Sequence, residues 1–298
     1  MLPLSSPGAR AATRPRPATC WSRHGGLREI APANFANPGI AVDTQGYVYI
    51  ADARNGRVQK FTPDGEPVMV FGTLGEGPLF RPVDVAVDES GVVYAVDFEL
   101  DRVVKYGPDG RHLRSWGESG SEGGQFQAAA GITVDGDGRV YVADFYNHRI
   151  QVFDSESRLL NVLGSEGAGD GQLHYPTDMA VDGQGIMYVA DAYNYRVQKW
   201  AADGAFLAAW GGQGSGRDQL DVPSGVAVDG DGIVHIADSA NRRVVACSGD
   251  GLVLAVREIG DMASGPLNTP ARVAVYGELV YLADTAGDRV IVLRFTGE

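Results

Sequence analysis

The chain repeats itself about every 47 residues, and this repetition restricts its fold more than any other feature. A segment reading apolar-Ala-Val-Asp, with Thr133 once in place of Ala, ends at the following residues: Asp43, Asp88, Asp135, Asp182, Asp229 and, in the sixth copy, Tyr276. Each copy continues with a Gly turn, a strand-like tetrad such as Tyr49-Ile50-Ala51-Asp52, and an Arg five positions later. A period of this length made of short strands is typical of a β-propeller. The sequence therefore predicts six blades.

Each repeat predicts four antiparallel strands, and no segment shows sustained helical periodicity. The first strand, for example 226–228, is apolar throughout, as expected where both faces of a strand are covered. The second is rich in Tyr and Val, residues that favour strands. The outermost, for example 112–116, ends at a Gly that begins a glycine-rich connection. The predicted fold class is all-β, a six-bladed β-propeller of four-stranded antiparallel blades.

The sixth repeat ends after its third strand, 289–295, and lacks an outer strand of its own. The stretch from Trp21 to Gly25 resembles those that begin at Trp116 and Trp210. We therefore predict that residues 18–21 pair beside the last strand and close the ring, which would remove an exposed edge. The predicted domains are a disordered basic Pro/Arg-rich tail over 1–18 and the propeller over 19–298. A transit sequence is the alternative reading of the tail.

Two stretches carry a recognisable repeat motif: Pro223 to Asp229, and Tyr141 to Gln151 with its Asn147 and Arg149. In these residues the chain resembles the NHL-repeat family, and the resemblance extends over about 19–298. It implies a six-bladed propeller, whereas it says much less about function. Leu100 and Gly287 stand where the family has Asn, so the second and sixth repeats are the least regular.

An Asp that ends each predicted second strand precedes an Arg by five residues, and the pair recurs in all six repeats. A catalytic pair would need one or two copies to differ from the rest. We interpret these pairs as structural, with the carboxylate capping its turn and the guanidinium binding it.

The charge of the chain restricts its partners. Twenty-five basic and 38 acidic residues give a net charge of −13, which argues against nucleic acid, because that binding rests on clustered Lys and Arg. Two cysteines cannot form a disulfide framework, and no apolar run is long enough to cross a membrane. We expect a soluble, monomeric propeller, with the cytoplasm favoured over an organelle.

The predicted topology places the connections between blades and the turns between second and third strands on one face, here called the top face. The mouth of the central channel should carry Pro38, Val83, Ala130, Thr177, Ser224 and Ala271. One position further on lie Asp84, Asp178 and Arg272, which predict an ion cluster. The peptide α-amidating lyases that share this propeller carry zinc-binding histidines at the first set of positions, and none of the six is His here. No metal, cofactor or catalytic residue is assigned, and a calcium-assisted, lactonase-like site on the two Asp is the sharper alternative.

Aromatic residues gather in the turns of repeats two to four, where the others carry small or polar residues. The predicted partner-binding residues are Phe98, Phe145, Tyr146, His148, Tyr193 and Tyr195. Tyr and Phe anchor protein interfaces, and the acidic neighbours favour a neutral or basic partner. The alternative is that these rings pack only against the adjoining connections.

The first hypothesis is thus a non-catalytic module that binds a peptide or protein on its top face. The second is an enzyme or a binder of a small ligand or metal, lyase- or lactonase-like, at the channel mouth. The third is RNA binding, as in tripartite-motif NHL proteins.

Overall fold

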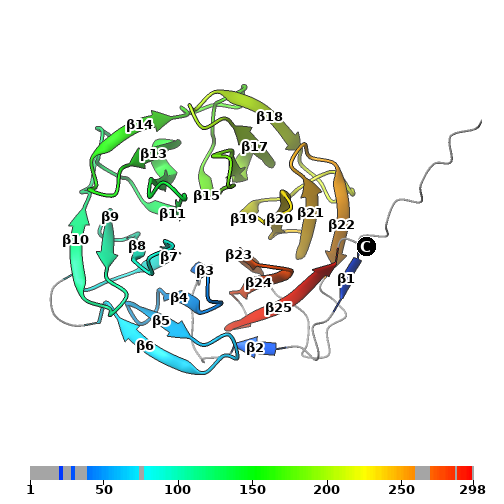
Figure 1. Ribbon diagram of the computed structural model, residues 1–298. Helices are drawn as coiled ribbons and strands as arrows, with labels where there is room; N and C mark the ends of the chain where they lie inside the picture. Colours follow the sequence, from blue (N-terminus) through cyan, green and yellow to red (C-terminus); the bar gives the residue numbers. More distant parts are fainter. Residues whose placement is uncertain are drawn as a thin grey trace, which may run out of the picture.

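Six antiparallel sheets stand around a central axis in the computed structural model, which describes residues 20–22, 28–30, 39–73, 77–258, 269–285 and 287–296 (Figure 1). Two single 3₁₀ turns are the helical elements of these residues: η1 (Phe145–Asn147) and η2 (Ala192–Asn194). The all-β prediction and the six blades are confirmed. The predicted tail, 1–18, lies outside the described residues. No helix in the described part is long and apolar enough to span a membrane.

The first three blades run from the axis outward in chain order. Blade 1 comprises β3 (Gly39–Val42), β4 (Val48–Asp52), β5 (Arg57–Phe61) and β6 (Pro67–Phe71). Blade 2 comprises β7 (Pro82–Val87), β8 (Val93–Asp97), β9 (Arg102–Tyr106) and β10 (His112–Trp116). Blade 3 comprises β11 (Ala129–Val134), β12 (Val140–Asp144), β13 (Arg149–Phe153) and β14 (Leu159–Leu163).

The remaining blades complete the ring. Blade 4 comprises β15 (Pro176–Val181), β16 (Met187–Asp191), β17 (Arg196–Trp200) and β18 (Phe206–Gly211). Blade 5 comprises β19 (Pro223–Val228), β20 (Ile233–Asp238), β21 (Arg243–Ser248) and β22 (Val253–Glu258). Blade 6 comprises β23 (Pro270–Tyr276), β24 (Leu279–Asp284) and β25 (Arg289–Thr296), with β1 (Cys20–Ser22) and β2 (Arg28–Ile30) along its outer edge.

The buried apolar residues of the described part form six clusters, and each cluster lies between two neighbouring blades. Tyr49 and Ala51 of blade 1 pack toward blade 2, whereas Val48 and Ile50 of the same strand pack toward blade 6. Side chains of a strand alternate between its two faces, and here both faces are covered. This explains why the second strands are buried along their whole length, for example β4 and β12.

The outer edge of β25 pairs with two short N-terminal strands. In β1, Trp21 lies opposite Phe295, and in β2, Ile30 lies opposite Val290. Residues 18 and 19 of the predicted closing strand lie outside the described part. The register differs from the sequence match, because Ile30, not Trp21, takes the place that Trp116 and Trp210 have in their blades. Hydrogen-bond register fixes the pairing of a strand, and one matching Trp does not specify it.

Candidate functional site

The top face is held together by the aspartates that end the second strands. The Asp144 carboxylate accepts a hydrogen bond from the backbone N–H of Gln127 (2.8 Å), and Asp191 accepts one from His174 (2.7 Å). Each donor belongs to the connection from the preceding blade. These bonds fix the connections against the turns between second and third strands, so both stand on the same face, as the topology predicts.

The six repeated Asp-Arg pairs are structural. Each Asp is fully buried, and the closest nitrogen-to-oxygen distances from each Arg to its Asp range from 2.7 Å in blades 3 and 5 to 3.6 Å in blade 2. Arg149 also donates to the carbonyls of Ser121 and Glu122. The pair therefore fixes both its own turn and the incoming connection.

Six aromatic rings meet on the top face of blades 3 and 4. This aromatic cluster consists of Phe145, Tyr146, His148, His174, Tyr175 and Tyr193. The Tyr175 ring lies at its centre, with its centroid 4.9 Å from Phe145, 4.4 Å from His148 and 5.0 Å from Tyr193. Tyr146 and Tyr193 are 50% and 48% exposed, so the cluster presents rings to solvent.

Local backbone geometry positions these rings. His148 follows η1 and Tyr175 precedes β15, and both adopt left-handed conformations with φ of 54° and 55°. The backbone N–H of Tyr175 donates to His148 Nδ1 (3.1 Å), and the two imidazoles of His148 and His174 stack 5.4 Å apart. Burial lowers the pKa of His148. The neutral ring thus forms a fixed support beneath the exposed tyrosines.

The structure brings four of the six predicted binding residues into this cluster: Phe145, Tyr146, His148 and Tyr193. Phe98 stands apart, with the Arg81 guanidinium 5.0 Å from its ring centroid. Tyr195 makes no ring contact with another aromatic residue of the described part. Sequence reasoning missed His174 and Tyr175, which come from the connection between β14 and β15. Comparing the connections as well as the turns would have found them.

A pocket of about 310 Å³ opens on the top face at the axis. Its lining includes five of the six positions predicted for the channel mouth: Val83, Ala130, Thr177, Ser224 and Ala271; Pro38 is outside the described residues. Phe98 and Phe145 also line it. Because Phe145 belongs to both, the axial pocket and the aromatic cluster adjoin at this residue.

Arg272 forms the floor of the axial pocket. Its guanidinium donates across the axis to the carbonyls of Ser224 (2.6 Å), Ala130 (3.0 Å) and Thr177 (3.2 Å). Arg272 also lines a second cavity of about 280 Å³, which lies among the six innermost strands. The side chain thus divides the central channel in two.

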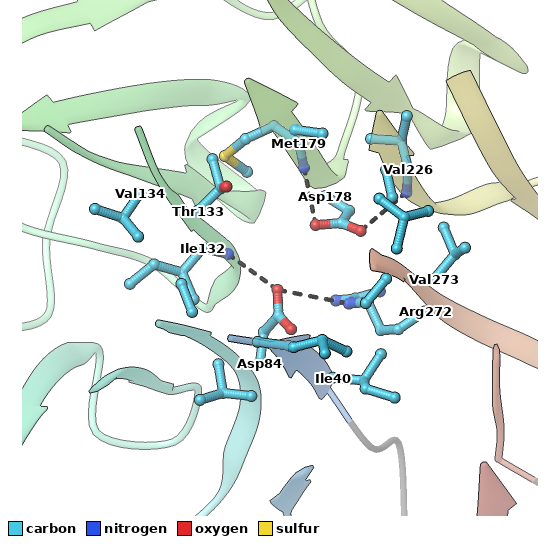
Figure 2. Close-up of a pocket in the computed structure, with 18 of the residues that line it drawn as sticks. Ile40, Asp84, Ile132, Thr133, Val134, Asp178, Met179, Val226, Arg272 and Val273 are labelled. Atoms are coloured by element: carbon cyan, nitrogen blue, oxygen red, sulfur yellow. Dashed lines mark hydrogen bonds and ion pairs between the residues drawn. The ribbon is translucent and has the colours of Figure 1, made fainter. Parts of the chain in front are cut away.

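The two predicted acids, Asp84 and Asp178, line this second cavity and are absent from the lining of the axial pocket (Figure 2). Asp84 Oδ2 lies 3.7 Å from Arg272 Nε and accepts from the backbone N–H of Ile132 (3.0 Å). Asp178 accepts from the backbone N–H groups of Met179 and Val226. The structure therefore brings the three predicted residues together, beneath the mouth rather than at it.

Both carboxyls have raised pKa values. Burial raises the pKa of Asp84 to about 6, with Arg272 opposing the shift. Burial and the charge of Asp84 raise the pKa of Asp178 to about 8. The two acids are therefore a coupled pair, in which ionisation of one disfavours ionisation of the other. Over the described residues, no three His, Cys, Asp or Glu side chains are grouped to hold a metal ion.

Comparison with known proteins agrees with this architecture. The family model of the NHL repeat matches residues 39–61 and 126–153. This chain is a six-bladed β-propeller with NHL repeats. The search of curated proteins found no match to the sequence of this chain.

Several solved structures share the fold at low sequence identity. A virginiamycin B lyase from Staphylococcus aureus is 13% identical, with a TM-score of 0.64 over 91% of this chain and 99% of the lyase. A gluconolactonase from Xanthomonas campestris is 16% identical, with a TM-score of 0.68 over 97% and 99% of the two chains. The WD40 repeats of RRP9 are 11% identical, with a TM-score of 0.67 over 93% and 100%. The NHL propeller is similar to these proteins in fold alone.

Proposed function

We propose that this NHL propeller is a non-catalytic interaction module that binds a peptide or protein on its top face. The observation that carries the proposal is the aromatic cluster, with two half-exposed tyrosines on a buried support and an open pocket beside them. Aromatic anchors over fixed supports are typical of the residues that dominate binding energy. The WD40 repeats of RRP9 share this propeller fold.

The surroundings of the cluster favour a neutral or basic segment. Glu122, Glu166 and Asp170 are exposed on the connections that flank it. Arg149 and Arg196 bind main-chain carbonyls of those connections and fix them. A surface that is fixed before binding loses less entropy on association. Acidic groups at its rim would accelerate the approach of a basic partner more than they add affinity.

The test uses peptides selected against the protein itself. A random peptide library displayed on phage is panned on the whole chain, and the enriched peptides are titrated by calorimetry. The triple variant Phe145→Ala, Tyr146→Ala, Tyr193→Ala should bind them at least tenfold more weakly, about 1.4 kcal/mol. The control removes three exposed side chains from outer strands: Val68→Ala, Leu113→Ala, Leu207→Ala. Peptides that bind the triple variant as tightly as the original chain would refute the proposal.

A second candidate is a small-ligand or enzyme site in the channel, and the coupled acids Asp84 and Asp178 favour it. Raised carboxyl pKa values beside a cavity are typical of functional sites. Folds similar to this one belong to proteins named as a lyase and a gluconolactonase. Calcium or zinc that raises the melting temperature of the original chain but not of Asp84→Asn would support this candidate; no shift with either ion would exclude a metal-assisted site.

A further inference from the structure

The outer strands of blades 1, 2 and 4 each carry an aromatic residue in one register position. Phe71 lies opposite Val58, Trp116 opposite Val103, and Trp210 opposite Val197. Each ring contacts the second-strand Tyr of its own blade, with centroids 6.5 Å apart for Phe71, 6.4 Å for Trp116 and 6.2 Å for Trp210. These rings fill the space between one blade and the next.

Blade 3 has Leu163 in this position, opposite Ile150. Leu163 occupies the position in blade 3 that Trp210 occupies in blade 4. Each of the two side chains lies against a glycine in a turn of the next blade, Gly204 for Leu163 and Gly251 for Trp210. A Cβ built on Gly204 would come within 2.4 Å of Leu163 Cδ2, and one on Gly251 within 2.6 Å of Trp210 Cγ. The slot between blades 3 and 4 therefore holds an aliphatic side chain where its neighbours hold a ring.

A pocket of about 210 Å³ occupies this slot. Tyr141, Val152 and Leu163 line it from blade 3, and Met187 and Ala201 from blade 4, while Arg139 and Asp203 supply charge. An apolar cavity of about 150 Å³ is enough to hold benzene, whereas pockets for drug-sized ligands usually begin at about 300 Å³. The volume suits one aromatic ring.

The strand beside the pocket offers a place for an extended chain. β14 is the outermost strand of its sheet and contains no charged residue or proline, the usual protections of an edge strand. Its Leu159, Leu160 and Val162 are exposed, Leu160 by 53%, and Leu160 also lines the pocket. An added strand takes its affinity from main-chain hydrogen bonds and its specificity from a side-chain pocket.

We propose that β14 binds an extended segment of a protein partner, and that an aromatic side chain of this segment, Trp or Phe, fills the slot between blades 3 and 4. The turns that line the slot connect first to second strands and third to fourth strands, and these turns lie on the face opposite the top face. The slot therefore opens on that opposite face. The site is thus separate from the aromatic cluster.

The experiment uses the methyl signal of Met187 in the whole chain labelled at methionine methyls. The probes are the blocked pentapeptide Thr-Val-Trp-Val-Thr, the same peptide with Ala for Trp, and 3-methylindole. The Trp peptide should shift the Met187 signal at concentrations at least tenfold below those needed for 3-methylindole, and should slow amide exchange in β14. The Ala peptide should do neither. Met69 and Met179 lie outside the pocket lining and serve as internal references.

Two variants separate the slot from the fold. Leu163→Trp supplies the missing ring, so it should raise the melting temperature and abolish the response of Met187 to the Trp peptide. Leu160→Glu changes an exposed residue and should weaken peptide binding at least tenfold with the melting temperature unchanged. The double variant Tyr146→Ala, Tyr193→Ala should bind the Trp peptide as tightly as the original chain does. The proposal is overturned if the Trp peptide leaves Met187 unmoved, if 3-methylindole binds as well as the peptide, or if Leu163→Trp binds it normally.

Discussion

At the scale of single residues, the charged groups of this propeller divide into those that repeat and those that do not. Every blade has an Asp-Arg pair like Asp144 and Arg149, whereas Asn147 and Gln151, which also donate to Asp144, lack counterparts in some blades. A pair present six times is explained by a need that every blade shares. Arg272, by contrast, has glycines or acids in the corresponding places of the other blades, so its role belongs to the axis.

Removing one repeated Arg should destabilise the protein. Arg149→Ala leaves the Asp144 carboxylate buried without its 2.7 Å partner, which should cost about 1 to 3 kcal/mol of unfolding free energy. Arg158→Ala is the control, since its pair with Asp154 is at the surface and should contribute much less to stability. Urea unfolding of both variants measures the difference, and equal losses would contradict a structural role for the pair.

The coupled acids should make stability depend on pH. The raised pKa of Asp178 means that, between about pH 4 and about pH 8, the folded protein retains a proton that the unfolded chain has released. The free energy of unfolding should therefore fall as pH rises through this range. Asp178→Asn cannot ionise, and its unfolding free energy, measured at intervals from pH 5 to 8, should fall less steeply. Parallel pH profiles for the two proteins would show that this acid is not held protonated.

At the scale of elements, the innermost strands show how a repeated sequence yields an asymmetric axis. Glycines alternate with charged residues around it: Gly39, Asp84, Gly131, Asp178, Gly225 and Arg272. A Cβ on Gly131 would lie 2.5 Å from the Thr177 carbonyl oxygen and 2.9 Å from Asp178 Cα. Each of these glycines thus makes room for the next blade's backbone.

Filling this space should be costly. Gly131→Ala forces strands β11 and β15 apart and should lower the unfolding free energy by about 1 to 3 kcal/mol. Gly183→Ala is the matched control, because an added Cβ there meets nothing within 4 Å. Thermal unfolding compares the two. If Gly131→Ala and Gly183→Ala have the same melting temperature, the close approach at Gly131 does not contribute to stability.

The sequence predicted strands better than it predicted contacts between connections. The apolar-Ala-Val-Asp segments and the Gly turns specify blades locally, because each strand of a blade pairs with the next strand of the same repeat. Comparing the connections would have singled out His174 and Tyr175 as aromatic residues, but not their contacts, because these depend on a left-handed backbone at Tyr175 and on rings of blade 3. The slot at Leu163 was missed for a related reason: its width depends on side chains of two blades.

At the scale of the whole molecule, strands that are far apart in the sequence pair with each other in blade 6. β25 is flanked on its outer side by β1 and β2, so residues near 20 and 30 pair with residues near 295 and 290. A propeller with such a junction should unfold as one unit, because opening blade 6 would expose the edge of β25 and weaken its contacts with blade 1.

Deletion tests the junction. Removing residues 1–30 takes away both short strands and should lower the melting temperature by roughly 5 °C or more. Removing residues 1–18 only, the predicted tail, should leave it unchanged. If both truncated chains melt like the full chain, the N-terminal strands do not contribute to closure.

Hydrogen–deuterium exchange of the full chain, with and without a selected peptide at saturation, tests the proposed binding face most directly. Slower exchange is predicted at residues 145–148, 173–177 and 193–195, which carry the aromatic cluster and its connection. Protection confined to the outer strands or to the opposite face, with those three segments unchanged, would contradict it.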